Sequence, residues 1–147
     1  MTEEACFRAL IVEDDRNFRR LVEIRLKSWR PDIEITIAET LSEARRVLSQ
    51  CTMPFSLVIL DQHLPDGMGA TLLDHPRLEE SAVLAVSADE APDLPAQALK
   101  GGARQFLHKR QISEPLLLPL LEALVERKQM EYELVQAKLR KSKMDTI

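Results

Sequence analysis

The chain has 147 residues, of which 45% are hydrophobic and 30% are charged, and its formal net charge is −4. This length fits one domain with a core of its own, and the composition excludes a disordered or fibrous protein. The acidic balance argues against a surface that mainly binds nucleic acid, and neither a membrane span nor a signal core is present, so we expect a cytoplasmic protein.

Apolar runs that alternate with longer amphipathic stretches predict five strands. The runs lie at residues 7–12, 33–38, 56–60, 83–86 and 105–107. The second run alternates polar and apolar residues, which favours a strand at an edge of a sheet. The third is nearly continuous, as is typical of a parallel sheet covered on both faces. Cys6 borders the first run and is expected to pack there as a small hydrophobic residue.

Helical spacing of apolar residues predicts a helix after each strand. Thr40 or Ser42 can cap the second helix. Because proline is costly inside a helix, the last helix should begin close to Pro119 or be irregular before it. The predicted helices cover residues 18–26, 41–48, 68–73 and 95–99, and a long one runs from near Glu114 to beyond Arg140. This alternation predicts an α/β three-layer sandwich with right-handed crossovers, which binds ligands at the carboxyl ends of its strands.

Residues suited to phosphoryl chemistry lie just after four of the predicted strands. Carboxylates at close quarters repel one another, and Mg²⁺ removes this conflict because it binds oxygen ligands and leaves room for phosphate oxygens. A lysine would neutralise further charge, a hydroxyl could bond a phosphoryl oxygen, and a carboxylate attacking phosphorus would form an aspartyl phosphate. Each residue alone is more often a turn or cap residue, so the prediction depends on their joint placement. The residues are Glu13, Asp14, Asp15, Asp61, Ser87 and Lys109.

At these positions the chain closely resembles the receiver domain of bacterial response regulators. The matching segments, in the expected order and spacing, are ALIVEDD at 9–15, LVILDQHLPDG at 57–67, AVSA at 85–88 and GARQFLHK at 102–109. The resemblance implies a flavodoxin-like fold whose five parallel strands have the order 2-1-3-4-5. It also implies a receiver domain over residues 1–125 and a helical extension over residues 126–147.

The resemblance further implies a role for each site residue. Asp61 would be the phosphoacceptor, and Asp14 and Asp61 would bind Mg²⁺ directly, together with the main-chain carbonyl of His63. Glu13 would act mostly through a metal-bound water. Ser87 would be the switch hydroxyl, Lys109 the phosphate-pairing lysine and Phe106 the switch aromatic residue. Asp15 lies one place beyond the usual acidic pair and is expected at a helix amino terminus.

The implied function is that of a phosphoacceptor in two-component signalling, and not that of an enzyme. A sensor histidine kinase or a histidine phosphotransfer protein would supply the phosphoryl group. Phosphorylation adds about −1.5 to −2 charges, which Ser87 and Lys109 would move to meet. Phe106 would then rotate inward, and the surface formed by the fourth helix, fifth strand and fifth helix would change shape.

The chain departs from the family pattern at Arg110, where a proline is usual. Without proline we expect a trans peptide bond and a differently placed Lys109 loop. His63 and Asp89 flank the expected site and either tune phosphate hydrolysis or are solvated loop residues. His75 and His108 are expected to be structural.

Two other functions and one assembly remain open from the sequence. One rival is a receiver-like interaction module that does not depend on phosphorylation. The other is a Mg²⁺-dependent phosphatase, which would need a second aspartate at the position of His63.

Residues 118–142 carry a modest heptad pattern. This pattern is typical of a dimerising coiled coil or of a helix that leads to an output domain, and the alternative is a solvated helical extension. A homodimer would form through this helix or through the fourth-helix, fifth-strand and fifth-helix face, and we expect no membrane or direct nucleic-acid partner.

Overall fold

A computed structural model of the chain describes residues 6–89 and 105–145. Its main sheet contains five parallel strands in the order β2-β1-β3-β6-β7. This order confirms the flavodoxin-like arrangement, with the sequence-predicted β2 at one edge. The strands are β1 (Arg8–Val12), β2 (Glu34–Ala38), β3 (Leu57–Asp61), β6 (Ala82–Ser87) and β7 (Gln105–His108).

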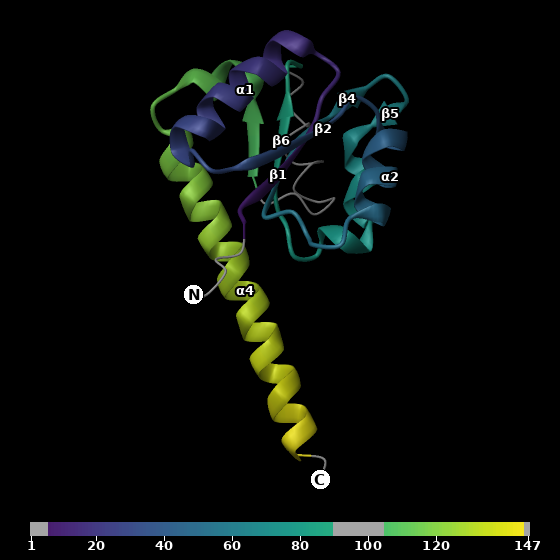
Figure 1. Cartoon of the computed structure of the whole chain (residues 1–147), viewed down its shortest axis with the longest axis vertical. Helices are drawn as coiled ribbons and strands as arrows, with labels where there is room; N and C mark the ends of the chain where they lie inside the picture. Colours follow the sequence, from purple (N-terminus) through teal and green to yellow (C-terminus); the bar gives the residue numbers. More distant parts are fainter. Residues whose placement is uncertain (1–5, 90–104, 146–147) are drawn as a thin grey trace.

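Helices cover both faces of the sheet, as Figure 1 shows. One face carries α1 (Arg16–Trp29) and the first turns of α4 (Leu117–Asp145). The other carries α2 (Leu41–Gln50) and two short 3₁₀ helices, η1 (Gly69–Asp74) and η2 (Pro76–Leu78). Each layer buries its own apolar cluster against the strands, so the continuous apolar runs of β1 and β3 are covered from both sides.

Polar caps explain where α1 and α2 begin. The Asp15 carboxylate accepts the backbone N–H groups of Asn17 at 2.9 Å and Phe18 at 3.3 Å, which confirms its expected place at a helix amino terminus. The Thr40 hydroxyl accepts the N–H of Glu43 at 3.1 Å, so Thr40 is the cap of α2. These local contacts fix where the chain turns from each strand end into the following helix.

One local expectation holds only in part and another is wrong. The helix predicted at residues 68–73 is present as the 3₁₀ helix η1 instead of a regular α-helix, and it follows a hairpin of β4 (His63–Leu64) and β5 (Gly67–Met68) that was not predicted. Gly67 in the hairpin has a φ of 144°, which only glycine adopts readily, and Pro76 holds the preceding residue in an extended conformation, so the short helix ends at Asp74. Cys6 is exposed instead of buried, because it precedes β1 and lies outside the core.

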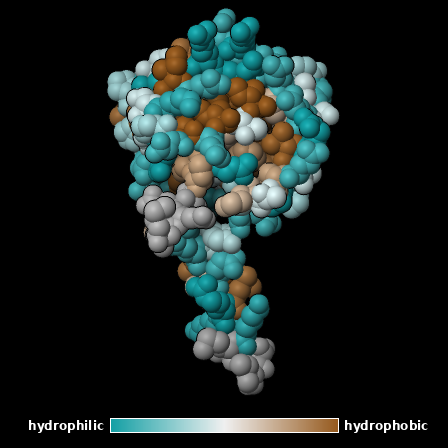
Figure 2. Space-filling view, viewed as in Figure 1, coloured by the Kyte–Doolittle hydropathy of each residue, from teal (hydrophilic) through white to brown (hydrophobic). Residues whose placement is uncertain are grey.

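The long helix α4 begins at Leu117, close to the expected start at Pro119. Pro119 therefore lies in the first turn, where its missing N–H would have no intrahelical partner in any case. The expected helix at 95–99 lies outside the described residues. The later part of α4 projects away from the sheet (Figure 1), and on its visible face hydrophobic side chains are scattered among hydrophilic ones (Figure 2). Among the described residues, no helix is long and apolar enough to span a membrane.

Candidate functional site

The register of the parallel strands brings the predicted site residues to one rim of the sheet. Glu13 and Asp14 follow β1, Asp61 ends β3, Ser87 ends β6 and Lys109 follows β7. On neighbouring strands Val12 is paired with Leu60, Asp61 with Val86 and Ser87 with His108. The carboxyl ends of β1, β3, β6 and β7 therefore end at nearly the same level, which gathers residues from four loops.

Three carboxylates form a cluster at this rim. Glu13, Asp14 and Asp61 each offer an oxygen atom within 4.8 Å of the others. Glu13 is fully buried and Asp61 is 3% exposed, whereas Asp14 faces solvent. Burial and the neighbouring Asp61 carboxylate raise the pKa of Glu13 to about 8, although Lys109 acts in the opposite direction. The positive charge of Lys109 therefore does not fully offset the burial of Glu13 and its repulsion by Asp61.

Lys109 supplies the positive charge of the site. Its Nζ donates to Glu13 Oε1 and lies 3.3 Å from Asp61 Oδ2. Burial would lower the pKa of Lys109, but the two carboxylates outweigh it and the pKa is raised, so the amine stays protonated at neutral pH. The same nitrogen lies 4.7 Å from the ring centre of Phe18 on α1, which adds a cation–π contact.

The donor set fits the Mg²⁺ ion that the resemblance implies. Oxygen atoms of three carboxylates are the hard ligands that this ion prefers, and one of them is exposed at the mouth of the cluster. Glu13 Oε2 is buried and, within the described part of the chain, accepts no hydrogen bond. A divalent cation, or a water bound to it, would satisfy this oxygen and offset the repulsion between the carboxylates.

The remaining predicted residues lie on β4, β6 and β7 or just after β6. Ser87 is fully buried, and its Oγ accepts the N–H of Asp89 at 3.0 Å. The His63 N–H donates to Asp61 Oδ1 at 3.3 Å, and His63 Nε2 lies 3.5 Å from Asp89 Oδ2. Phe106 is partly buried on β7 and packs against the apolar cluster on the α2 side of the sheet. The roles assigned to Ser87, Phe106, His63 and Asp89 stay predictions.

Two supporting residues were not found from the sequence. Arg19 Nη1 donates to the backbone carbonyls of Glu13 at 3.1 Å and Asp14 at 3.3 Å, and so holds the acidic loop. Gly69 lies against the Asp61 backbone so closely that an added Cβ would collide with the Asp61 carbonyl oxygen. No sequence pattern marks Arg19. A glycine such as Gly69, shortly after a predicted strand end, is a sequence signal for close backbone approach.

The loop after β7 adopts a 3₁₀ helix, η3 (Lys109–Ser113), despite the arginine at position 110. None of the described peptide bonds is cis, which confirms the trans bond expected there. Lys109 nevertheless reaches both Glu13 and Asp61. The missing proline therefore does not keep the lysine from the acidic cluster.

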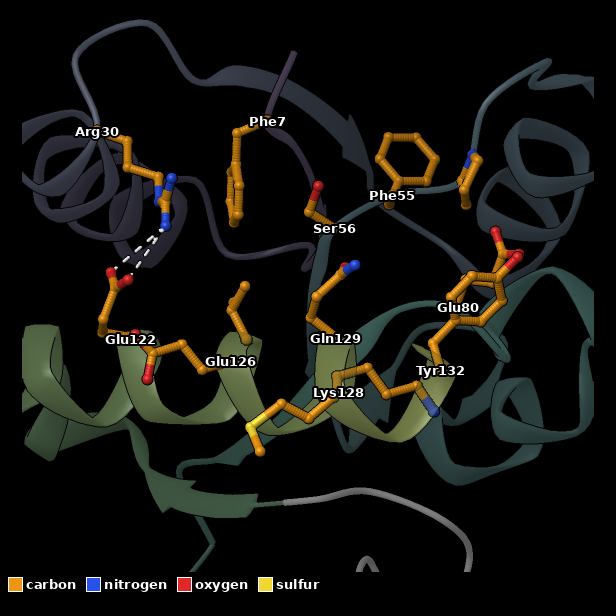
Figure 3. Close-up of a pocket in the computed structure, with 13 residues that line it drawn as sticks. Phe7, Arg30, Phe55, Ser56, Glu80, Glu122, Glu126, Lys128, Gln129 and Tyr132 are labelled. Atoms are coloured by element: carbon orange, nitrogen blue, oxygen red, sulfur yellow. Dashed lines mark hydrogen bonds and ion pairs between the residues drawn. The ribbon is translucent and has the colours of Figure 1, made fainter. Parts of the chain in front are cut away.

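A separate hollow of about 480 Å³ lies at the opposite end of the sheet (Figure 3). It is formed between α4 and the residues before β1 and β3, including Phe7 and Ser56. An ion pair of 3.4 Å between Arg30 and Glu122 borders it, and Tyr132 lies at its other end (Figure 3). This hollow does not include the acidic cluster, so the chemistry expected at the strand ends does not belong to it.

Comparison with known proteins adds independent information. A protein-family model described as the response regulator receiver domain matches residues 9–122. The chain is 38% identical over 104 residues to the response regulator protein PilR of Pseudomonas aeruginosa, an alignment that covers 69% of this chain and 22% of PilR. It is 31% identical over 103 residues to the two-component response regulator ARR11 of Arabidopsis thaliana, covering 69% of this chain and 19% of ARR11. The chain thus spans about a fifth of the length of these relatives.

Solved structures share the fold. A signal receiver domain of a putative LuxO repressor from Vibrio parahaemolyticus matches with a TM-score of 0.68 and 24% identity, covering 88% of this chain and 98% of that one. A response regulator from Burkholderia pseudomallei with a phosphorylated aspartic acid and a calcium ion matches with a TM-score of 0.64 and 19% identity, covering 89% of this chain and 73% of that one. At these identities the likeness shows the architecture alone.

Proposed function

The chain belongs to the response regulator receiver domain family, and from this we infer that Asp61 accepts a phosphoryl group from a sensor histidine kinase or a histidine phosphotransfer protein. Members of this family act in two-component signalling and are generally not enzymes. The observation that best supports the inference is the convergence of three carboxylates with Lys109 Nζ, 3.3 Å from Asp61 Oδ2.

The proposed reaction is a direct transfer of the phosphoryl group. A carboxylate oxygen of Asp61 attacks phosphorus and forms a P–O bond, while the P–N bond of a phosphohistidine breaks. The electron pair of that bond stays on the imidazole nitrogen, which then takes a proton. Lys109 carries a fixed positive charge beside the oxygen atoms of the arriving group, and the nearby Ser87 hydroxyl can donate a hydrogen bond to one of them.

Mg²⁺ is the cofactor that the site fits. Asp14, Asp61 and the main-chain carbonyl of His63 would hold it, and Glu13 would act through a bound water. When bound, the ion offsets the negative charge of the phosphoryl group and of the carboxylates.

The proposed output is a change of surface shape. Phosphorylation of Asp61 adds charge and acceptor oxygens, and Ser87 and Lys109 move towards them. Phe106, partly buried in the described state, then turns into the space that Ser87 leaves. The result is a two-state response that starts from a local electrostatic event.

Replacing the phosphoacceptor tests this function. Incubation with a small phosphodonor and Mg²⁺ should place acid-labile phosphate on the wild-type chain, and Asp61→Asn should abolish this labelling because an amide is not a comparable nucleophile. Asp32→Asn is the matched control, since Asp32 is exposed and is not a member of the acidic cluster. Labelling that persists in Asp61→Asn would contradict the assignment.

The two rival functions predict different results in the same assays. A Mg²⁺-dependent phosphatase would turn over many equivalents of a phosphorylated small molecule, whereas a phosphoacceptor keeps the group on Asp61 until it is hydrolysed. The histidine at position 63, in place of a second aspartate, disfavours the phosphatase. A module independent of phosphorylation would not respond to beryllofluoride with Mg²⁺.

A further inference from the structure

We propose that His108 is a positioning residue that ties the end of β6, which carries Ser87, to the segment that carries Lys109. The proposal rests on the proposed function and adds a residue to it. The basis is a bridge made by one imidazole: His108 Nε2 lies 3.0 Å from the carbonyl oxygen of Ala88, and His108 Nδ1 lies 3.2 Å from the backbone nitrogen of Arg110.

The two contacts fix the state of the ring. A carbonyl oxygen only accepts hydrogen bonds and a backbone N–H only donates them. Nε2 must therefore carry the proton that is donated to Ala88, and Nδ1 must be unprotonated in order to accept the N–H of Arg110. Only the neutral imidazole with its proton on Nε2 makes both bonds.

The bridge joins the neighbours of two site residues. Ala88 directly follows Ser87, whose Oγ is bonded to the N–H of Asp89 at 3.0 Å. Arg110 directly follows Lys109, whose Nζ contacts Glu13 and Asp61. One rigid ring therefore couples a displacement at the end of β6 to the backbone that carries Lys109.

Other polar contacts hold the Lys109 loop around this bridge. The backbone N–H of His108 donates to Gln111 Oε1 at 2.8 Å, which completes the cap of η3. At the far end of η3, Arg25 donates to the carbonyls of Ile112 at 3.2 Å and Glu114 at 2.8 Å. A proline at position 110 would fix φ, whereas arginine leaves it unrestricted. The hydrogen bonds of Gln111 and Arg25 restrict this part of the backbone instead.

An ordinary helix cap would need only part of this arrangement. Capping η3 requires the Nδ1 contact with Arg110, but it does not require Nε2 to reach Ala88 on the loop after β6. Asparagine is a good cap with a shorter side chain, so His108→Asn keeps the first contact and loses the second. Alanine loses both. The pair of variants separates the bridge from the cap.

Three measurements test the bridge. First, ¹⁵N chemical shifts of the imidazole in the wild-type protein should show the proton of His108 on Nε2; a proton on Nδ1 overturns the proposal without any variant. Second, in the free protein, His108→Asn should be destabilised less than His108→Ala in urea, because it keeps the cap, and should let the amide of Asp89 exchange faster with solvent than in the wild type. Unchanged exchange at Asp89 means that His108 is only a cap.

Third, His108→Asn should bind beryllofluoride with Mg²⁺ roughly fivefold more weakly than the wild type, as expected for the loss of one hydrogen bond that preorganises the site. Wild-type affinity in this variant also contradicts the proposal. The first two measurements need no phosphoryl mimic. If the wild type fails to respond to beryllofluoride while the tautomer and the exchange behave as expected, the proposed function is wrong and the bridge stands.

Discussion

Charge balance among a few side chains dominates the site at the scale of single residues. Glu13 is buried beside Asp61, and among the described residues Lys109 is a cation that contacts both. At the mouth of the site, His63 and Asp89 face each other at 3.5 Å, with each side chain about half exposed. An imidazole in that position can hold a water molecule near the bond that hydrolysis must break.

His63 is therefore expected to affect the lifetime of the phosphorylated state. His63→Ala should slow the loss of acid-labile phosphate by roughly fivefold, because one hydrogen bond of about 1 kcal/mol to the attacking water is lost. The measurement is the decay of label after removal of the phosphodonor. His75→Ala is the control, since His75 bonds Ser49 on α2 and lies outside the site. An unchanged decay rate in His63→Ala would mean that His63 is a solvated loop residue.

Contacts between elements place the loop that carries the phosphoacceptor. The β4–β5 hairpin after Asp61 presents Asp66 to the amino terminus of α2. Its carboxylate accepts the N–H groups of Leu41 at 2.8 Å and Ser42 at 2.9 Å. Thr40 and Asp66 therefore share the free N–H groups of the first turn of α2, and the hairpin is fastened to the helix.

This contact should make the stability of the fold depend on pH. The backbone N–H groups of Leu41 and Ser42 lower the pKa of Asp66 below its ordinary value of 3.8. The carboxylate therefore stabilises the folded state above about pH 3.8, and the contribution is lost as the pH falls through the lower folded-state pKa. Asp66→Ala should reduce the free energy of unfolding at about pH 6, and its difference from wild type should shrink near pH 3.

Urea unfolding followed by Trp29 fluorescence measures this difference at each pH. Asp32→Ala, at an exposed aspartate before β2, serves as the control for the loss of one surface charge. A difference between wild type and Asp66→Ala that does not change with pH would show that the carboxylate is not the stabilising group.

The whole molecule consists of a compact sandwich and a helix that extends from it (Figure 1). Along the later part of α4 several large apolar side chains are more than half exposed, namely Met130, Leu134, Val135 and Leu139. Val135 and Leu139 belong to the predicted heptad pattern. Earlier members of that pattern, such as Leu121, are buried in the core instead, so only the projecting part of the helix is free to pair with a second copy.

We expect phosphorylation-linked dimerisation through this part of α4. Beryllofluoride with Mg²⁺ should raise the solution mass from 16.7 kDa to about twice that value, measured by light scattering. Leu139→Glu should prevent the increase, because a charge at the helix contact would be buried without a partner. Gln136→Glu adds the same charge at a position outside the heptad pattern, and this variant should still show the increase in mass. A mass that stays at the monomer value in the wild type would exclude this assembly while leaving the phosphoacceptor role standing.

The sequence alone determined the layered architecture, the five strands of the main sheet and the identity of the acidic residues that follow them. These features depend on local periodicity and on the rule that parallel strands end at one edge, so Asp14, Asp61 and Lys109 could be placed at one rim before any coordinates. The helix starts at Asp15 and Thr40 could also be predicted from the sequence, because a cap involves residues only two or three positions apart.

Only the tertiary structure decided which of these groups touch. The Lys109 amine meets Glu13 across 96 residues of sequence, and the His108 ring reaches Ala88 across 20. Whether Cys6 is exposed, whether Leu121 faces the core and whether residues 69–74 form a 3₁₀ helix depend likewise on neighbours that are distant in the chain. Local periodicity says which face of an element is apolar, but the partners of a polar side chain are set by the packing of whole elements against one another.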